Sequence, residues 1–241
     1  MSVPAPDADA RAFVAALRRA VARGLAATRP LHALLAGRLD RPTLALWAAR
    51  YYGELRVFLD VKLPERLRLC PYEAMLAKQL FARAYVEEQG GFRAGEDHAT
   101  LFRRLCDALD VPAALLAAET HRQACRFAYL RALEPSEETL VRELAVTYAW
   151  ESAAPVVGRA LAAALAHHYG VPADALAFFT LHESVDRAHS AACLRVLLVH
   201  ARTEALRALA LATVGETLDL DRLLGGLPGA RQGSVGARVV R

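Results

Sequence analysis

Helical periodicity recurs through most of this 241-residue chain, from Ala10 to about Leu211, and short segments bearing proline or glycine interrupt it. In the first helical stretch, Phe13, Leu17 and Val21 follow one another at four-residue intervals, which places them on one face of a helix. Hydrophobic residues make up 55% of the chain and are mainly alanine and leucine, both good helix formers, whereas aromatic residues make up 7%. The sequence therefore predicts an all-α protein.

The segments between the periodic stretches predict a single domain of about seven or eight helices. Asp40 followed by Pro42 is typical of a helix start, the pair Gly90-Gly91 is typical of a helix end, and Pro155 predicts a kink in the longest helix. After Gly215 the chain becomes rich in glycine and arginine, so we expect a helical domain over residues 1–215 and a loosely ordered tail over residues 216–241. Long helices are expected at residues 9–26, 43–63, 72–88, 98–109, 137–168 and 180–211, with shorter ones at 31–37, after Val111 and after Pro172. One break is expected between Pro64 and Pro71.

Charge and hydropathy exclude several functional classes. The chain has 30 Lys and Arg against 26 Asp and Glu, but the basic residues are scattered rather than gathered in a basic arm, so we expect no nucleic-acid partner. Uninterrupted apolar stretches fall short of the roughly 20 residues that cross a bilayer, and residues 1–10 lack the order of a signal peptide. These features predict a cytoplasmic protein with no membrane partner, and its four cysteines are expected to be reduced thiols.

Three potential metal ligands stand close together near the end of the chain. His182, Asp186 and His189 are separated by four and then three residues, a spacing that places all three on one face of a helix. Two imidazoles and a carboxylate on one face suit a transition metal such as iron, manganese or zinc. A polar helix face in water is the alternative interpretation of the same spacing.

A carboxylate earlier in the chain supports the metal interpretation. Glu151 lies within an apolar helical stretch, where an isolated charge would be costly to bury, so it should bind either a metal or one of the many arginines. Upstream, Glu87 and Glu88 end one helix and His98 opens the next, so a carboxylate and an imidazole can face one site across the glycine loop. Glu54 lies in an aromatic-rich helix, which makes it a further candidate ligand.

The full donor set is larger than one metal ion requires. Carboxylates and histidines that face inward from several helices hold two iron or manganese ions in helical bundles, whereas a single zinc site would leave surplus charge inside the protein. Which of the two adjacent glutamates takes part is left open by the spacing. The aromatic residues Tyr51, Tyr52 and Trp150 are interpreted as core residues, with cavity lining as the alternative. The candidate ligands are Glu87 or Glu88, His98, Glu151, His182, Asp186 and His189, with Glu54 as a possible seventh.

Several motifs together resemble the heme-oxygenase-like diiron oxidases and oxygenases, a superfamily whose helical fold is shared by thiaminase II and the pyrroloquinoline quinone synthase. The motifs lie between about Pro30 and Ala210 and so cover most of the chain. They include Glu151-Ser-Ala-Ala-Pro, the run from Phe178 to His189, and Glu87-Glu88-Gln-Gly followed by His98. The resemblance implies a heme-oxygenase-like bundle in which Glu87, His98, Glu151, His182, Asp186 and His189 bind iron.

The implied function is that of a non-heme diiron enzyme that uses O2 to oxidise a small molecule in a biosynthetic pathway. Family resemblance implies an amino acid, an amine or a fatty acid as substrate, two ferrous ions or a Mn–Fe pair as cofactor, and O2 as cosubstrate. A homodimer and a separate electron donor are compatible with this interpretation. The alternatives are a metal-free enzyme, which would use a cysteine as in thiaminase II or histidines as in the quinone synthase, and a non-catalytic helical interaction protein.

Overall fold

Ten α-helices make up the part of the chain that the structure describes. The structure is a computed structural model, and it describes residues 8–218 apart from the side chains of residues 182–187. No strand forms within those residues, and the all-α prediction is confirmed. None of these helices combines the length and hydrophobicity needed to cross a membrane. The helices are α1 (Ala8–Ala27), α2 (Arg29–Leu35), α3 (Arg41–Val57), α4 (Leu63–Leu69), α5 (Met75–Glu88), α6 (His98–Ala108), α7 (Ala113–Phe127), α8 (Glu137–Tyr169), α9 (Ala177–His200) and α10 (Glu204–Thr217).

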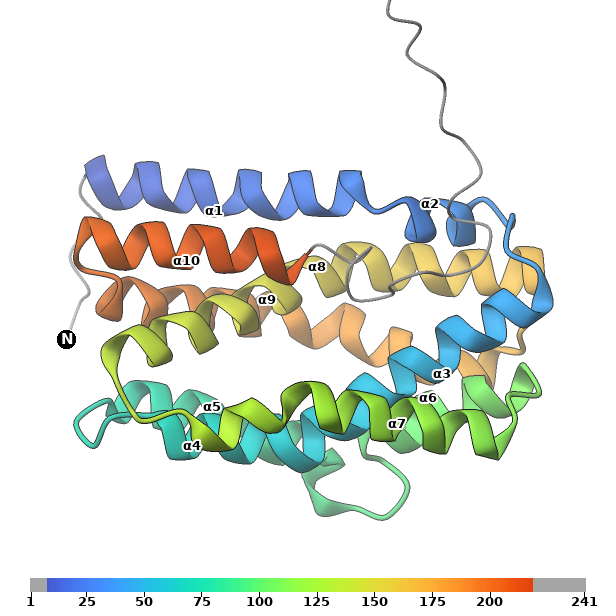
Figure 1. Ribbon diagram of the computed structural model, residues 1–241. Helices are drawn as coiled ribbons and strands as arrows, with labels where there is room; N and C mark the ends of the chain where they lie inside the picture. The colour runs from blue at the N-terminus through green and yellow to red at the C-terminus, as the bar shows by residue number, and fades with distance from the viewer. Residues whose placement is uncertain (1–7, 219–241) are drawn as a thin grey trace, which may run out of the picture.

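The helices α8 and α9 form the centre of the bundle, and the other helices pack around them. A short connection that contains one 3-10 turn (Ala173–Leu176) lets α9 fold back along α8. Figure 1 shows α1 and α10 side by side on one side of this pair, with α3 and α7 on the other. The two central helices therefore separate two halves of the molecule, and a side chain on either can face the interior.

The apolar core has two main clusters that meet along α8 and α9. One cluster joins α2, α3 and α6 to the second half of α8 and the start of α9. The other joins α1, α5 and α10 to the first half of α8 and the end of α9. Along α8 the change from one cluster to the other falls between Ala153 and Leu161, close to Glu151. The candidate ligands on α8 and α9 therefore lie where the two cores meet.

The helical chain does not break at Pro64, where the predicted break begins. After α3, residues Phe58–Lys62 form one π-helical turn, and α4 continues to Leu69. In this wider turn the backbone N–H of Leu63 donates to the carbonyl of Phe58, five residues earlier, and Pro64, which has no backbone N–H to donate, follows directly. This π-helical segment matters for the site because Phe58 and Lys62 both line the internal cavity described below.

The predicted final helix over residues 180–211 was wrong, because it is two helices. α9 ends at His200 and α10 begins at Glu204. Thr203 caps α10, and its hydroxyl oxygen accepts a hydrogen bond from the backbone N–H of Leu206 at 3.2 Å. α10 ends at Thr217, two residues beyond the predicted limit of the helical domain. Residues 219–241, most of the predicted tail, lie outside the described residues.

The longest helix, α8, runs without interruption across Pro155, the residue at which a kink is predicted.

Candidate metal centre

A tight turn after α5 brings the end of that helix close to the start of α6. α5 ends at Glu88, and Gly90 follows with a φ of +62°. A Cβ atom on Gly90 would lie 2.4 Å from the carbonyl carbon of Glu96, so glycine is needed for this close approach. His98 is the first residue of α6. The glycine loop thus returns the chain so that His98 faces the last turn of α5.

Side chains from four helices then contact one another. Oε2 of Glu88 on α5 is in direct contact with Nδ1 of His98 on α6. Nε2 of His189 on α9 lies 2.8 Å from Oε2 of Glu87, and its Nδ1 lies 3.4 Å from Oε2 of Glu151 on α8. These five residues, Glu87, Glu88, His98, Glu151 and His189, are called the carboxylate–imidazole cluster below. Both adjacent glutamates face it, each towards a different histidine.

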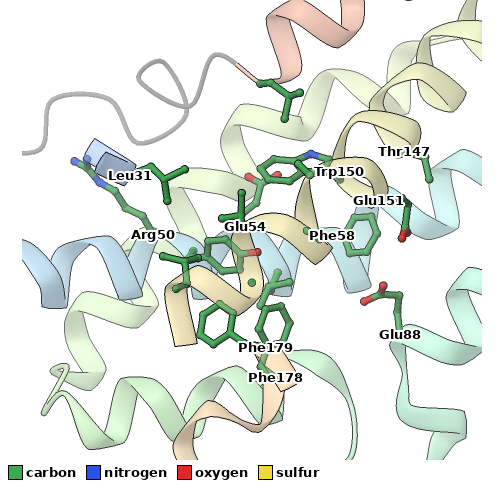
Figure 2. Close-up of a pocket in the computed structure, with 18 of the residues that line it drawn as sticks. Leu31, Arg50, Glu54, Phe58, Glu88, Thr147, Trp150, Glu151, Phe178 and Phe179 are labelled. Atoms are coloured by element: carbon green, nitrogen blue, oxygen red, sulfur yellow. The ribbon is translucent and has the colours of Figure 1, made fainter. Parts of the chain in front are cut away.

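Negative charge in this cluster is poorly solvated. Glu88, His98 and Glu151 expose 13%, 10% and 17% of their side chains. Figure 2 shows the carboxylates of Glu88 and Glu151 directed towards each other. Burial raises the pKa of Glu151, and the charge of Glu88 raises it further, against the opposing effect of the hydrogen bond with His189. A bound cation would relieve this unfavourable concentration of carboxylates.

The donor types of the cluster fit iron. Three carboxylates and two imidazoles from four helices are the ligand types that helical bundles use for paired iron or manganese ions. Among the side chains that the structure describes, no three of these residues converge as a ready-made ion site. Instead, each imidazole contacts a carboxylate, so these pairs would have to separate when a metal binds.

Two of the predicted ligands are on α9 but cannot be added to this geometry. His182 and Asp186 belong to the helical stretch Ala177–His200, as the predicted spacing requires. Their side chains lie outside the described residues. Their assignment as ligands therefore stays a prediction, based on their spacing with His189.

Glu54 faces a different set of partners. Its Oε1 lies 2.9 Å from Nζ of Lys62, and the amide nitrogen of Gln123, in the orientation that satisfies both amide atoms, donates to Oε2 at 3.1 Å. Lys62 is buried, and its ammonium lies 4.2 Å from the centroid of the Phe127 ring. Glu54 thus neutralises a buried cation. Its role as a further metal ligand stays a prediction.

An internal cavity of about 150 Å³ adjoins the cluster. Glu88 and Glu151 line one part of it, and most of the remaining wall is apolar or aromatic (Figure 2). A second hollow of about 530 Å³ opens at the exposed loop after α5 and is lined by Glu87, Glu88, His98 and His189. The cluster therefore lies between an apolar interior and the protein surface. The aromatic residues of the cavity wall are Trp47, Tyr51, Phe58, Trp150, Phe178 and Phe179.

Two of the aromatic residues interpreted as core residues also line this cavity, namely Tyr51 and Trp150. Tyr51 serves both purposes, because its ring stacks on Phe102 with the centroids 4.7 Å apart while another part of it faces the cavity. The sequence pattern could not separate the two roles, since both place an aromatic side chain on the inward face of a helix.

Three cations in the cavity wall were missed from the sequence. Arg50, Lys62 and Arg66 line the cavity, and each lies beside a carboxylate: Arg50 is 3.7 Å from Glu119 and Arg66 is 2.9 Å from Glu143. The only sequence signal was a basic residue on an otherwise apolar helix face, as with Arg66 between Leu63 and Leu69. Arginine is so common on this chain that the signal does not stand out.

The fold and the cluster define a class of protein: an all-helical bundle of the heme-oxygenase-like type, with acidic and histidine side chains at the end of an internal cavity. Residues 45–222 match the model of the family described as iron-containing redox enzyme. The chain belongs to that family, which confirms the predicted superfamily.

A solved structure agrees with this fold assignment. A TenA homolog from Pseudomonas syringae pv. tomato str. DC3000 superimposes with a TM-score of 0.70 over 93% of this chain and 96% of that one, at 14% sequence identity. At this identity the match shows a shared fold. No curated protein matches the sequence significantly.

Proposed function

We propose that the protein is a non-heme diiron oxidase or oxygenase that uses O2 to oxidise a small molecule held in the internal cavity. The observation that carries this proposal is the carboxylate–imidazole cluster, which joins four helices at the boundary between an apolar cavity and the surface in a member of an iron-containing redox family. Iron, when bound, would supply the activation of O2 and accept or deliver the electrons of the oxidation.

The residues of the chain would divide the remaining tasks. The ligands would be the five cluster residues together with the predicted His182 and Asp186. The aromatic wall of the cavity would hold the substrate and exclude water. Burial raises the pKa of the Glu151 carboxyl, so in the absence of metal this group gives up its proton less readily than an exposed glutamate does.

Metal content tests the proposal directly. After anaerobic loading with Fe(II) and removal of free iron, we expect about two iron ions per chain, and a transient visible absorption on mixing with O2. Wild-type protein that retains no iron would rule the proposal out, and one ion per chain would contradict its dinuclear part.

Two variants on the same helix make the test specific. His189→Asn should lose iron, because this imidazole contacts both Glu87 and Glu151. His200→Asn is the matched control, since His200 lies on the same helix and contacts Glu137 instead, at 2.9 Å. Both variants should keep the helical circular-dichroism signal. Equal iron contents in the two variants would show that His189 is not a ligand.

The metal-free alternative draws on the fold that the chain shares with the TenA homolog. A thiaminase II-like reaction would require a nucleophilic thiolate. Burial raises the pKa of Cys70 to about 11 and that of Cys106 to about 12, and it also raises the pKa of Cys193, so these thiols stay protonated near neutral pH. Cys125 is exposed, and its Sγ lies 3.6 Å from Nε2 of His121.

A thiamine hydrolysis assay separates this alternative from the proposed one. We expect no activity, because the residues that line the internal cavity include none of the four cysteines. Hydrolysis by metal-free protein that disappears when one cysteine is changed to serine would favour the thiaminase II-like reaction instead.

A further inference from the structure

Arg66 is a buried cation in the wall of the internal cavity. Its side chain is 2% exposed, and its Nε donates a hydrogen bond to Oε2 of Glu143 at 2.9 Å. Its Cζ also lies 5.2 Å from the centroid of the Phe58 ring and 5.9 Å from that of Phe81. The ion pair and the two rings hold the guanidinium in one position.

One nitrogen of this guanidinium, Nη2, is a hydrogen-bond donor that the described residues leave unsatisfied. Among the residues that the structure describes, no acceptor forms a hydrogen bond with Nη2 of Arg66, although the atom is buried. A buried charged donor left without an acceptor is costly, and such groups are rare in folded proteins. Neutralising Glu143 would need only a point charge such as lysine, whereas arginine has five N–H donors in a planar fork. The spare donor therefore points to a ligand that brings its own acceptor.

The position of Arg66 is set relative to the cluster by α8. Glu143, Thr147 and Glu151 follow one another at four-residue intervals, so they lie on one face of the helix, about 6 Å apart along its axis. Thr147 and Glu151 both line the cavity, and Arg66 lies close enough to Glu151 for its charge to lower the pKa of that carboxyl. A small molecule bound at Arg66 would thus occupy the same cavity that Glu88 and Glu151 line.

The rest of the cavity limits the ligand. In Figure 2, Phe58 and Thr147 lie towards the same end of the cavity as Glu88 and Glu151, and Leu31 lies at the opposite end. The volume of about 150 Å³ is that of a cavity that holds a benzene-sized molecule, so a ligand of roughly six to ten non-hydrogen atoms is expected. Its body should be apolar, to match the aromatic wall.

We propose that the Arg66 guanidinium binds the carboxylate of a small monocarboxylic acid, whose apolar part extends along the aromatic wall of the cavity. That this acid is the substrate rests on the proposed function. Binding of the acid itself requires no iron. The carboxylate would accept a hydrogen bond from Nη2, and the adjacent carbons would lie nearest to Glu88 and Glu151.

Ligand binding to metal-free protein tests this assignment. Both tryptophans of the chain, Trp47 and Trp150, line the cavity, so their fluorescence reports a molecule that enters it. The probes are hexanoate, hexan-1-ol and hexylamine, which share one chain length and differ in charge. We expect hexanoate to bind roughly tenfold or more tightly than hexanol, since a charge-assisted hydrogen bond is gained.

Equal affinity for the acid and the alcohol would overturn the proposal. Preference for hexylamine would also overturn it, because the carboxylates of the cluster would then be the recognition groups. Absence of any fluorescence change with all three probes would count against it as well.

Variants at Arg66 locate the effect. Arg66→Lys keeps a positive charge beside Glu143 but removes the spare donor, so hexanoate affinity should fall roughly tenfold while hexanol affinity stays unchanged. Arg66→Met combined with Glu143→Leu removes both charges together, which protects folding, and it should abolish the preference for the acid. Undiminished hexanoate binding by either variant would contradict the proposal.

The matched control is Arg68→Lys. Arg68 lies on the same short helix, but its guanidinium donates to the carbonyls of Leu130 and Leu133 outside the cavity. It should bind hexanoate as the wild type does. These titrations use metal-free protein, so the two proposals can fail separately. A failure to bind iron would refute the proposed function and leave the carboxylate site standing. A failure to bind hexanoate would refute the carboxylate site and leave the proposed function standing.

Discussion

Glu143 and Glu151 lie two turns apart on α8, and their surroundings differ sharply. Glu143 forms an ion pair with Arg66, and both side chains are almost fully buried. Glu151 contacts an imidazole and faces the carboxylate of Glu88. The first region is neutral without any addition, whereas the second concentrates negative charge. The same residue type thus acts within one helix as part of the scaffold and as part of a site that suits a cation.

The largest expected effect tests the scaffold region. Arg66→Met leaves Glu143 buried without its cation, and we expect a loss of about 3–5 kcal/mol in the free energy of unfolding. Urea denaturation of the metal-free protein measures it. Adding Glu143→Leu should restore most of the loss, because the pair is then replaced by apolar side chains. A loss below about 1 kcal/mol in the single variant would mean that Glu143 is solvated and that the comparison is wrong.

Iron should stabilise the cluster region in the wild type. At a free Fe(II) concentration one hundred times the dissociation constant, we expect a gain of about 2.7 kcal/mol in the free energy of unfolding for each iron ion bound, under anaerobic conditions. The variant Glu151→Gln should lose most of this gain, while the double variant Arg66→Met/Glu143→Leu should keep it. If the two variants respond alike to iron, the two glutamates do not differ in function.

Most of the fold was predictable from the sequence, because helix formation depends on local pattern and end signals. The bounds of α1, α6 and α8 agree with the predicted ones to within a residue or two. The prediction failed where a local signal was ambiguous. The proline at position 64 predicts a break, whereas the chain continues there through a π-helical turn. The cap at Thr203 lacks the proline or glycine that marks the other helix boundaries.

The members of the carboxylate–imidazole cluster were predictable only where polar residues interrupt apolar helices or flank the loop between them. Glu151 and His189 stood out in this way, and Glu88 and His98 did so through the loop between them. Arg66 did not, since its partner Glu143 is 77 residues away and a single basic residue beside leucines resembles a surface position. A buried cation can be identified only when the tertiary contact that neutralises it is known.

The pH dependence of stability should separate the two glutamates further, with a smaller effect than iron. Burial, reinforced by the charge of Glu88, raises the pKa of Glu151 in the folded protein. As pH rises from the ordinary glutamate pKa through this raised value, the unfolded chain loses its proton first, so the metal-free protein loses stability. Glu151→Gln should flatten this decline at pH values above the ordinary glutamate pKa. Parallel urea-denaturation curves of wild type and variant across that range would contradict the assignment.

The smallest expected effect concerns the end of α8 that precedes Glu143. Ser136 caps this helix, and its Oγ accepts a hydrogen bond from the backbone N–H of Thr139 at 3.0 Å. Ser136→Ala should lower the free energy of unfolding by about 1 kcal/mol. Its iron content should equal that of the wild type, because the cluster lies about four turns further along the helix. Stability and iron content are therefore measured in the same variant. A loss of iron would mean that the first turns of α8 position Glu151 and that the surroundings of Glu143 and of Glu151 do not act independently.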